Sequence, residues 1–171
     1  MPKYSKTKEN GHFPETLILK CLYPSSGSQA SSGQITPSRN EAPILFERKG
    51  TYYLMYGPIC CFCHQGSGIE VWTAPHPLGP WRNMNLDLNP NDFFTGREIK
   101  AQCNYVVEIK HDSDIMDSDY LYTGDLWSTA PDGLKSHDIQ YWSPPLQFDD
   151  SVQPPSIKPL KFVNNFTLIF K

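Results

Sequence analysis

The chain has 171 residues, a formal net charge of −3 and a pI near 5.9. Its length predicts one domain with a buried core, and its acidic balance offers no basic surface for a phosphate backbone, so nucleic-acid binding is not expected. No apolar run approaches the ~20 residues of a membrane span, so no membrane partner is expected. The polar, Lys-rich segment Met1–Asn10 lacks the apolar stretch of a secretory signal.

The composition favours an all-β protein. Aromatic residues make up 13% of the chain, and its 16 prolines break the sequence into short apolar runs without helical periodicity. Residues 1–38 differ from the rest, because they hold one apolar cluster and the Ser/Gly-rich patch Ser25–Gly33. We expect them to form an atypical, poorly ordered lead-in to a domain at 39–171.

A β-hairpin is predicted just after Glu41. The runs Ile44–Arg48 and Thr51–Tyr56 are rich in β-branched and aromatic residues, and the two residues Lys49-Gly50 separate them. Two such runs joined by a pair that ends in Gly are typical of a hairpin. The hairpin would hold the Glu41 carboxylate at the mouth of a sheet.

The next strand is predicted at Ile69–Ala74, where apolar residues alternate. Pro75–Pro80 then predicts a turn, with Trp81 as its anchor. Residues 82–98 are rich in Asn and Asp without clear periodicity, which indicates a long connection.

The C-terminal half continues as strands and turns. The predicted segments are, in order, a strand pair Asn104–Ile109 and Tyr120–Thr123, a polar loop Gly124–Asp138, an edge strand Gln140–Phe148 that prolines interrupt, and a last strand Phe162–Phe170. Repeated meanders of this kind are typical of β-propeller blades.

The cysteines predict no metal or cofactor. A structural zinc site needs two separated ligand pairs, whereas this chain has one crowded group, Cys60, Cys61, Cys63 and His64. Adjacent cysteines would strain if bonded to each other, so the alternatives are free thiols or a bridge from this group to Cys21 or Cys103. The odd total of five leaves at least one cysteine without a partner in the chain.

Several motifs together resemble one enzyme family. They are, in order, Glu41-Ala42-Pro43, Tyr52-Tyr53-Leu54, Val71-Trp72-Thr73-Ala74, Pro77-Leu78-Gly79-Pro80-Trp81, Ala101-Gln102-Cys103-Asn104-Tyr105, Tyr122-Thr123-Gly124-Asp125-Leu126-Trp127, Ser136-His137-Asp138 and Tyr141-Trp142-Ser143-Pro144. Their order resembles the five-bladed β-propellers of glycoside hydrolase family 43, most of all the branch of exo-β-1,3-galactanases. The resemblance covers residues 39–171 and implies about the C-terminal half of such a propeller.

The resemblance implies a glycosidase that acts on a plant- or algal-type β-galactan by inversion. Glu41 matches the general acid, which protonates the leaving oxygen while a base on the opposite face activates water. Gln102 matches the position proposed for the base in the galactanase-like branch. A neutral amide is a poor base, so we expect Gln102 to orient water or a sugar hydroxyl. The usual Asp base would lie in the other half of the propeller, and Leu126 stands where relatives commonly have Arg.

Four further residues are candidates for substrate binding: Asp125, Trp127, His137 and Tyr141. Each has a plainer alternative, because Asp after Gly also forms turns and aromatic side chains more often fill propeller cores. Adjacent side chains point to opposite faces of an extended chain, so only one of His137 and Asp138 would line a site.

Another class of function also fits the sequence. The chain could be a carbohydrate-binding propeller fragment without activity, or a truncated gene product. Open sheet edges would then favour self-association. The family resemblance implies an extracellular location.

Overall fold

The computed structural model describes residues 41–57, 66–92, 96–111, 118–127 and 141–169. It also gives the backbone of three short strands before them, β1 (Lys3–Tyr4), β2 (Leu19–Leu22) and β3 (Gln29–Ser31), which pair as one antiparallel sheet. Within these residues every regular element is a β-strand, so the predicted all-β class is confirmed. None of the described residues forms a helix long and apolar enough to cross a membrane.

The first large sheet is a four-stranded antiparallel meander. Its strands lie in chain order: β4 (Glu41–Arg48), β5 (Thr51–Gly57), β6 (Glu70–Ala74) and β7 (Arg82–Asp87). The turn between β4 and β5 has positive φ at both Lys49 (49°) and Gly50 (77°). This is the turn whose twist matches that of the flanking strands, which explains why the predicted hairpin forms.

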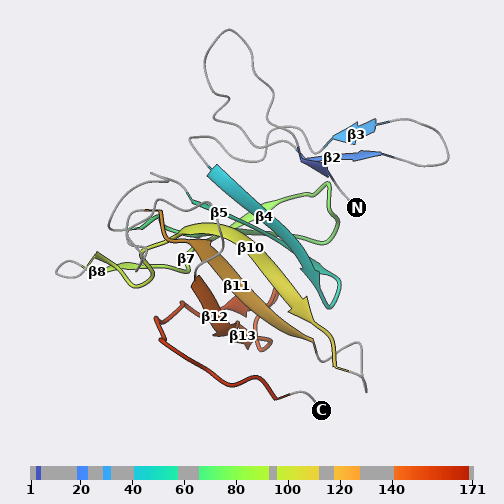
Figure 1. Cartoon of the computed structure of the whole chain (residues 1–171). Helices are drawn as coiled ribbons and strands as arrows, with labels where there is room; N and C mark the ends of the chain where they lie inside the picture. The colour runs from blue at the N-terminus through green and yellow to red at the C-terminus, as the bar shows by residue number, and fades with distance from the viewer. Residues whose placement is uncertain are drawn as a thin grey trace, which may run out of the picture.

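The second large sheet is a three-stranded meander of β10 (Gln102–Ile109), β11 (Asp119–Asp125) and β12 (Tyr141–Pro145). Two short antiparallel pairs complete the fold: β8 (Asn91–Asp92) with β9 (Gly96–Arg97), and β13 (Phe148–Asp149) with β14 (Ser156–Ile157). The first strands of the two large sheets, β4 and β10, lie side by side and run in the same direction (Figure 1).

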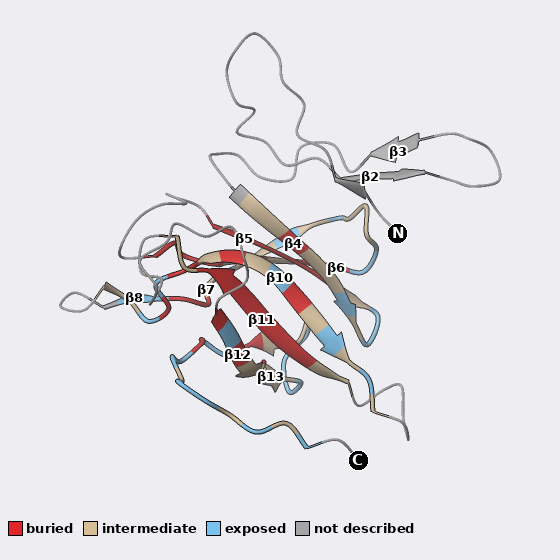
Figure 2. Cartoon of the chain, viewed as in Figure 1, coloured by how far each residue is buried: buried red, intermediate tan, exposed pale blue. Residues whose placement is uncertain are grey.

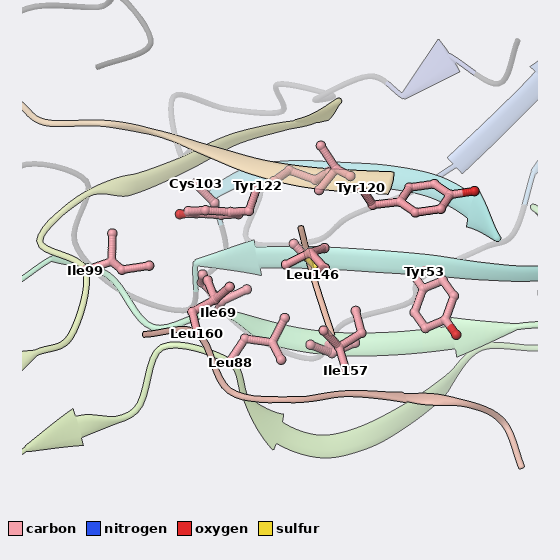
Figure 3. Close-up of a cluster of buried hydrophobic side chains, with 14 of the residues drawn as sticks. Tyr53, Ile69, Leu88, Ile99, Cys103, Tyr120, Tyr122, Leu146, Ile157 and Leu160 are labelled. Atoms are coloured by element: carbon pink, nitrogen blue, oxygen red, sulfur yellow. The ribbon is translucent and has the colours of Figure 1, made fainter. Parts of the chain in front are cut away.

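The main core fills the space between the two large sheets. Tyr53 and Met55 of β5 face it, together with Tyr122 of β11, and the interior is completed by residues from the connections and the C-terminal segment, including Ile69, Leu88, Ile99, Leu146, Ile157 and Leu160 (Figure 3). The alternate residues of β5, Leu54 and Tyr56, belong to a second cluster. Because both faces of β5 are covered, five consecutive residues of it are buried (Figure 2).

Two predictions of the sequence were wrong. Residues 82–98 were expected to form an irregular connection, but they hold β7, β8 and β9. Strand β7 is one of the two outer strands of its sheet and is nowhere fully buried, so polar side chains are tolerated and no apolar alternation marks it. The predicted last strand at Phe162–Phe170 does not form within residues 162–169. The Phe162 N–H bonds to the Glu98 side chain instead of a neighbouring strand.

Candidate functional site

The starts of β4 and β10 meet at one end of the core. The Cys103 thiol donates a hydrogen bond to the Ala42 carbonyl, with 3.2 Å between Sγ and O. Glu41 directly precedes Ala42, and Gln102 directly precedes Cys103. The hydrogen bond therefore brings together the backbone segments that carry the two predicted catalytic residues. The side chain of Glu41 lies outside the described part of the structure.

The backbone at Glu41 departs from a regular strand. The register of β4 against β5 shifts between Glu41 and Ile44, and Ala42 has a φ of 49°. A bulge of this kind changes the direction in which the neighbouring side chains point. Residues in such sparsely populated conformations cluster at functional sites.

Gln102 is held by Trp127. The indole Nε1–H donates to Gln102 Oε1 at 2.7 Å. Gln102 is the first residue of β10, and Trp127 follows the end of β11, so the bond spans two adjacent strands at the end where Glu41 lies. Both side chains are half-buried.

Asp125 is the cross-strand partner of Gln102. It is 6% exposed, and Asn104 Nδ2 donates to both of its carboxylate oxygens, at 2.9 and 2.8 Å. A buried carboxylate needs such donors, because burial without them would cost several kcal/mol. The arrangement places an oriented acceptor beside the Gln102 amide.

A buried asparagine that the sequence reasoning missed supports this end of β10. Asn89 is completely buried; its Nδ2 donates to the carbonyls of Ser67 and Ile99, and its Oδ1 accepts the Ile99 N–H at 2.9 Å. Asn89 thereby ties the segment before β10 to the segment before β6. No sequence signal marks Asn89, because it lies in a stretch of Asn and Asp without periodicity.

The hydroxyl of Tyr122, in the core next to the site, stays uncharged. Burial raises the pKa of the Tyr122 hydroxyl well above its usual value, and the nearby Cys103, Tyr141 and Asp125 raise it further. Within the described residues no group of three or more His, Cys, Asp or Glu side chains is placed to hold a metal ion. The group Cys60–His64 lies outside those residues, and so does the side chain of Cys21.

Tyr141 lies at this end as the cross-strand partner of Gly124, but its side chain is buried in the core. Tyr141 is only 5% exposed, and its ring stacks on Phe162 with the centroids 5.7 Å apart. Its burial leaves almost no ring face for a sugar. His137 lies outside the described residues. The structure therefore brings Gln102, Asp125 and Trp127 together with the backbone of Glu41.

The fold is similar to that of several solved glycoside hydrolases. A GH43 β-1,3-galactosidase, solved with galactodeoxynojirimycin, aligns over 90% of this chain with a TM-score of 0.64 and 21% sequence identity. The exo-β-1,3-galactanases of Clostridium thermocellum and Phanerochaete chrysosporium align with TM-scores of 0.60 and 0.55, identities of 18% and 17%, and coverages of 90% and 91% of this chain.

The likeness extends over only part of those proteins. The aligned region covers 40% of the galactosidase and 34% of each galactanase. No protein-family model matches the sequence. No curated protein matches it either. The structural likeness therefore identifies this chain as having the all-β fold of glycoside hydrolase family 43, over a part of that fold.

Proposed function

We propose that the chain is part of a glycosidase that hydrolyses a β-galactan-like polysaccharide by inversion, with Glu41 as the general acid. The observation that carries the proposal is the contact between Cys103 and Ala42, which sets the starts of β4 and β10 side by side in a fold similar to β-1,3-galactosidases and exo-β-1,3-galactanases. The chain is proposed to supply about the C-terminal half of a five-bladed propeller.

The mechanism assigns a role to each residue at this end. Glu41, protonated, gives its proton to the leaving glycosidic oxygen while water attacks the anomeric carbon from the opposite face. Gln102 orients the water or a sugar hydroxyl. Asp125 and Trp127 contribute to the sugar site, as does His137, which lies outside the described residues. Burial limits Tyr141 to the wall behind that site.

The test compares the chain with its Glu41→Gln variant on β-1,3-galactan and aryl β-galactosides. The amide cannot donate the acid proton, so we expect turnover to fall at least 100-fold. Glu108→Gln is the matched control, because Glu108 is an exposed carboxylate near the opposite end of β10, bonded to Ser118. Equal turnover by the wild type and Glu41→Gln would remove Glu41 from the reaction.

A second candidate function is carbohydrate binding without cleavage. It is favoured by the pairing of Asp125 with Asn104 and of Gln102 with Trp127, which orders a polar group of side chains within this chain. Calorimetric titration with β-1,3-galactobiose separates the two functions. Binding without measurable hydrolysis supports the second candidate.

We further propose that the chain self-associates through its open sheet edges, and that exposed aromatic side chains of the β10–β12 sheet take part in the contact. Tyr105 and Trp142 are 55% and 43% exposed, and both pair with Thr123 on one cross-strand row. Large exposed aromatics on a sheet face are typical of association surfaces. In sedimentation velocity, the double variant Tyr105→Ser/Trp142→Ser should be monomeric where the wild type forms dimers. The Kd of a weak interface is on the order of 100 μM. A wild type that stays monomeric at such a protein concentration would contradict this proposal.

A further inference from the structure

The segment that follows β14 carries a polar triplet that has no role in the proposed function. Asn165-Phe166-Thr167 matches the acceptor pattern of N-linked glycosylation, Asn-x-Thr with a middle residue other than Pro. No other Asn in the sequence is followed two positions later by Ser or Thr. We infer that Asn165 is a glycosylation site, which takes an oligosaccharide on its side-chain amide nitrogen and holds it on the outside of the molecule.

A three-residue motif is short, so its place in the fold decides whether it can be modified. None of the residues 161–169 is buried and none belongs to a strand, and the segment runs along the outside of the molecule (Figure 2). The Leu160 N–H donates to the Leu88 carbonyl, and the Phe162 N–H donates to the Glu98 side chain. The triplet follows both attachments, so it can enter a modifying enzyme without breaking a strand pairing.

The two groups that the modifying enzyme recognises face solvent together. Along an extended chain, alternate side chains point to opposite sides. Asn165 and Thr167 are exposed, whereas Phe166 between them is half-buried, and so is Leu168 after them. The amide and the hydroxyl therefore lie on the outer side of the segment, while the apolar side chains pack towards the molecule. A glycan on Asn165 would point away from the fold.

The acceptor amide is also free of other bonds. Within the described residues, neither the Asn165 amide nor the Thr167 hydroxyl has a hydrogen-bond partner. This distinguishes Asn165 from Asn89 and Asn104, whose side-chain amides donate to main-chain carbonyls and to the Asp125 carboxylate, respectively. Attachment of a sugar to Asn165 would therefore break no hydrogen bond of the folded chain.

The modification joins the amide nitrogen to the anomeric carbon of a sugar. Nδ2 of Asn165 gives up one proton to solvent and forms a bond to that carbon of an oligosaccharide carried on a lipid diphosphate. The bond between the anomeric carbon and the phosphate oxygen of the carrier breaks, and the lipid diphosphate leaves with the electron pair. The carrier belongs to the secretory route, the route that the extracellular location implied by the family resemblance requires.

The test is translation of the full chain behind a cleavable secretory leader in the presence of microsomes. Only chains protected from added protease are scored, so chains that never enter the microsomes are not counted. We expect one stepwise increase in apparent mass, which peptide-N-glycosidase removes. Thr167→Ala destroys the triplet but keeps Asn165, and it should abolish the step. Asn164→Gln is the matched control, because it removes the neighbouring Asn but keeps the triplet, and it should retain the step. Protected wild-type chains without the step would overturn the inference.

A second measurement tests the outward orientation of Asn165. The glycosylated chain is purified from secreting cells, and its melting temperature is compared before and after enzymatic removal of the glycan. We expect a change of less than about 2 °C, because a modification on the exposed side leaves the packing intact.

The comparison variant is Asn165→Gln/Phe166→Asn/Leu168→Thr, in which the acceptor triplet begins one residue later, on the half-buried side of the segment. Removal of the glycan from this variant should raise its melting temperature by about 3 °C or more, because the glycan there competes with packing. Removal from the natural site that raises the melting temperature as much would overturn the outward orientation. Neither measurement uses a galactan, so the glycosylation site can fail or hold independently of the proposed activity.

Discussion

Ala42 is the residue at which the backbone beside the proposed acid is most unusual. Its φ of 49° lies in the left-handed region, which costs a residue with a Cβ roughly 1–2 kcal/mol. Its carbonyl accepts the Cys103 hydrogen bond, so the surrounding contacts hold this conformation. This unfavourable conformation of Ala42 lies next to Glu41, where the register of β4 shifts.

We predict opposite effects for two substitutions of Ala42. Ala42→Val should lower the free energy of unfolding by about 2 kcal/mol, because β-branched side chains fit the left-handed region poorly. Ala42→Gly should leave stability unchanged or raise it by up to about 1 kcal/mol. Urea unfolding of the two variants measures the difference. Equal stability of Val and Gly at this position would show that residue 42 does not keep a positive φ in solution.

Asn89 shows how one buried amide can hold two segments. It satisfies two carbonyls and one N–H that would otherwise be buried without partners. The main-chain carbonyl of Asn89 also accepts a hydrogen bond from the guanidinium of Arg97, which forms an ion pair with Asp87. The loss of one partner in such a network leaves the others unsatisfied.

Asn89→Ala should therefore lower the free energy of unfolding by about 3 kcal/mol, since each buried group left without a partner costs about 1–3 kcal/mol. Asn91→Ala is the control, because Asn91 is exposed two residues away, and its effect should stay within about 0.5 kcal/mol. Guanidinium unfolding of both variants gives the comparison. A similar loss of unfolding free energy in Asn89→Ala and Asn91→Ala would contradict a stabilising role for the buried hydrogen-bond network of Asn89.

At the scale of elements, most strands of the two large sheets were indicated by their sequences, whereas the outer strand β7 was not. The hairpin β4–β5 combines alternating apolar residues with a turn that needs positive φ. Strand β7 has its partner β6 on one side only, so its side chains meet no requirement for apolar alternation. Pattern reading is therefore reliable where a strand has buried residues and weak where, as in β7, none is fully buried.

The connections between elements are constrained by close backbone approaches, and two glycines test this. Gly50 and Gly66 have nearly the same φ, 77° and 78°. A Cβ at Gly50 would meet nothing within 4 Å, whereas one at Gly66 would lie 2.5 Å from the Ile99 carbonyl oxygen. A residue with a Cβ would have about the same backbone strain at either position, because the φ angles are nearly equal. Only at Gly66 would its Cβ also collide with the main chain.

We predict that Gly50→Ala lowers stability by about 1 kcal/mol and Gly66→Ala by about 3 kcal/mol or more. Differential scanning calorimetry of the two variants isolates the collision, because the backbone strain is common to both. Equal melting temperatures would mean that the segment before β6 does not approach the segment before β10 as closely as the structure shows.

At the scale of the whole molecule, distant segments close the end of the core opposite the candidate site. Arg48, the last residue of β4, donates to both carboxylate oxygens of Asp150 at 2.6 and 2.9 Å, and its guanidinium lies 4.1 Å from the Phe148 ring centroid. The hydrogen bond from Arg48 lowers the pKa of Asp150 to about 2 from an ordinary value of 3.8. The pair links the hairpin to the C-terminal segment.

The lowered pKa predicts the pH dependence of stability. A carboxyl whose folded pKa lies below its unfolded value stabilises the fold above about pH 4, and this contribution is lost as the pH falls through about 2. Asp150→Asn lacks the contribution at every pH. The melting temperature of the wild type should therefore exceed that of Asp150→Asn at pH 6, and the gap should narrow towards pH 2.5.

The difference in melting temperature should also narrow in 1 M salt, because the Asp150 side chain is about half exposed and the Debye length there is only about 3 Å. Thermal unfolding followed by circular dichroism at pH 6 and pH 2.5 measures it. A gap that stays constant between the two pH values would show that the ion pair does not form.

The sequence by itself determined the all-β class, the central hairpin and the strand pair Asn104–Ile109 and Tyr120–Thr123, which the structure extends to Gln102 and Asp125. These follow from local patterns, since alternation and turn chemistry act between residues close in the chain. Only the tertiary structure decided that Ala42 touches Cys103, that Trp127 holds Gln102 and that Asn89 supports both segments. Such contacts join residues whose spacing has no period, and they exist only once the strands and the segments between them have come together in space. For the same reason Tyr141, apt for a sugar by its type, lies in the core, where packing against Phe162 determines its place.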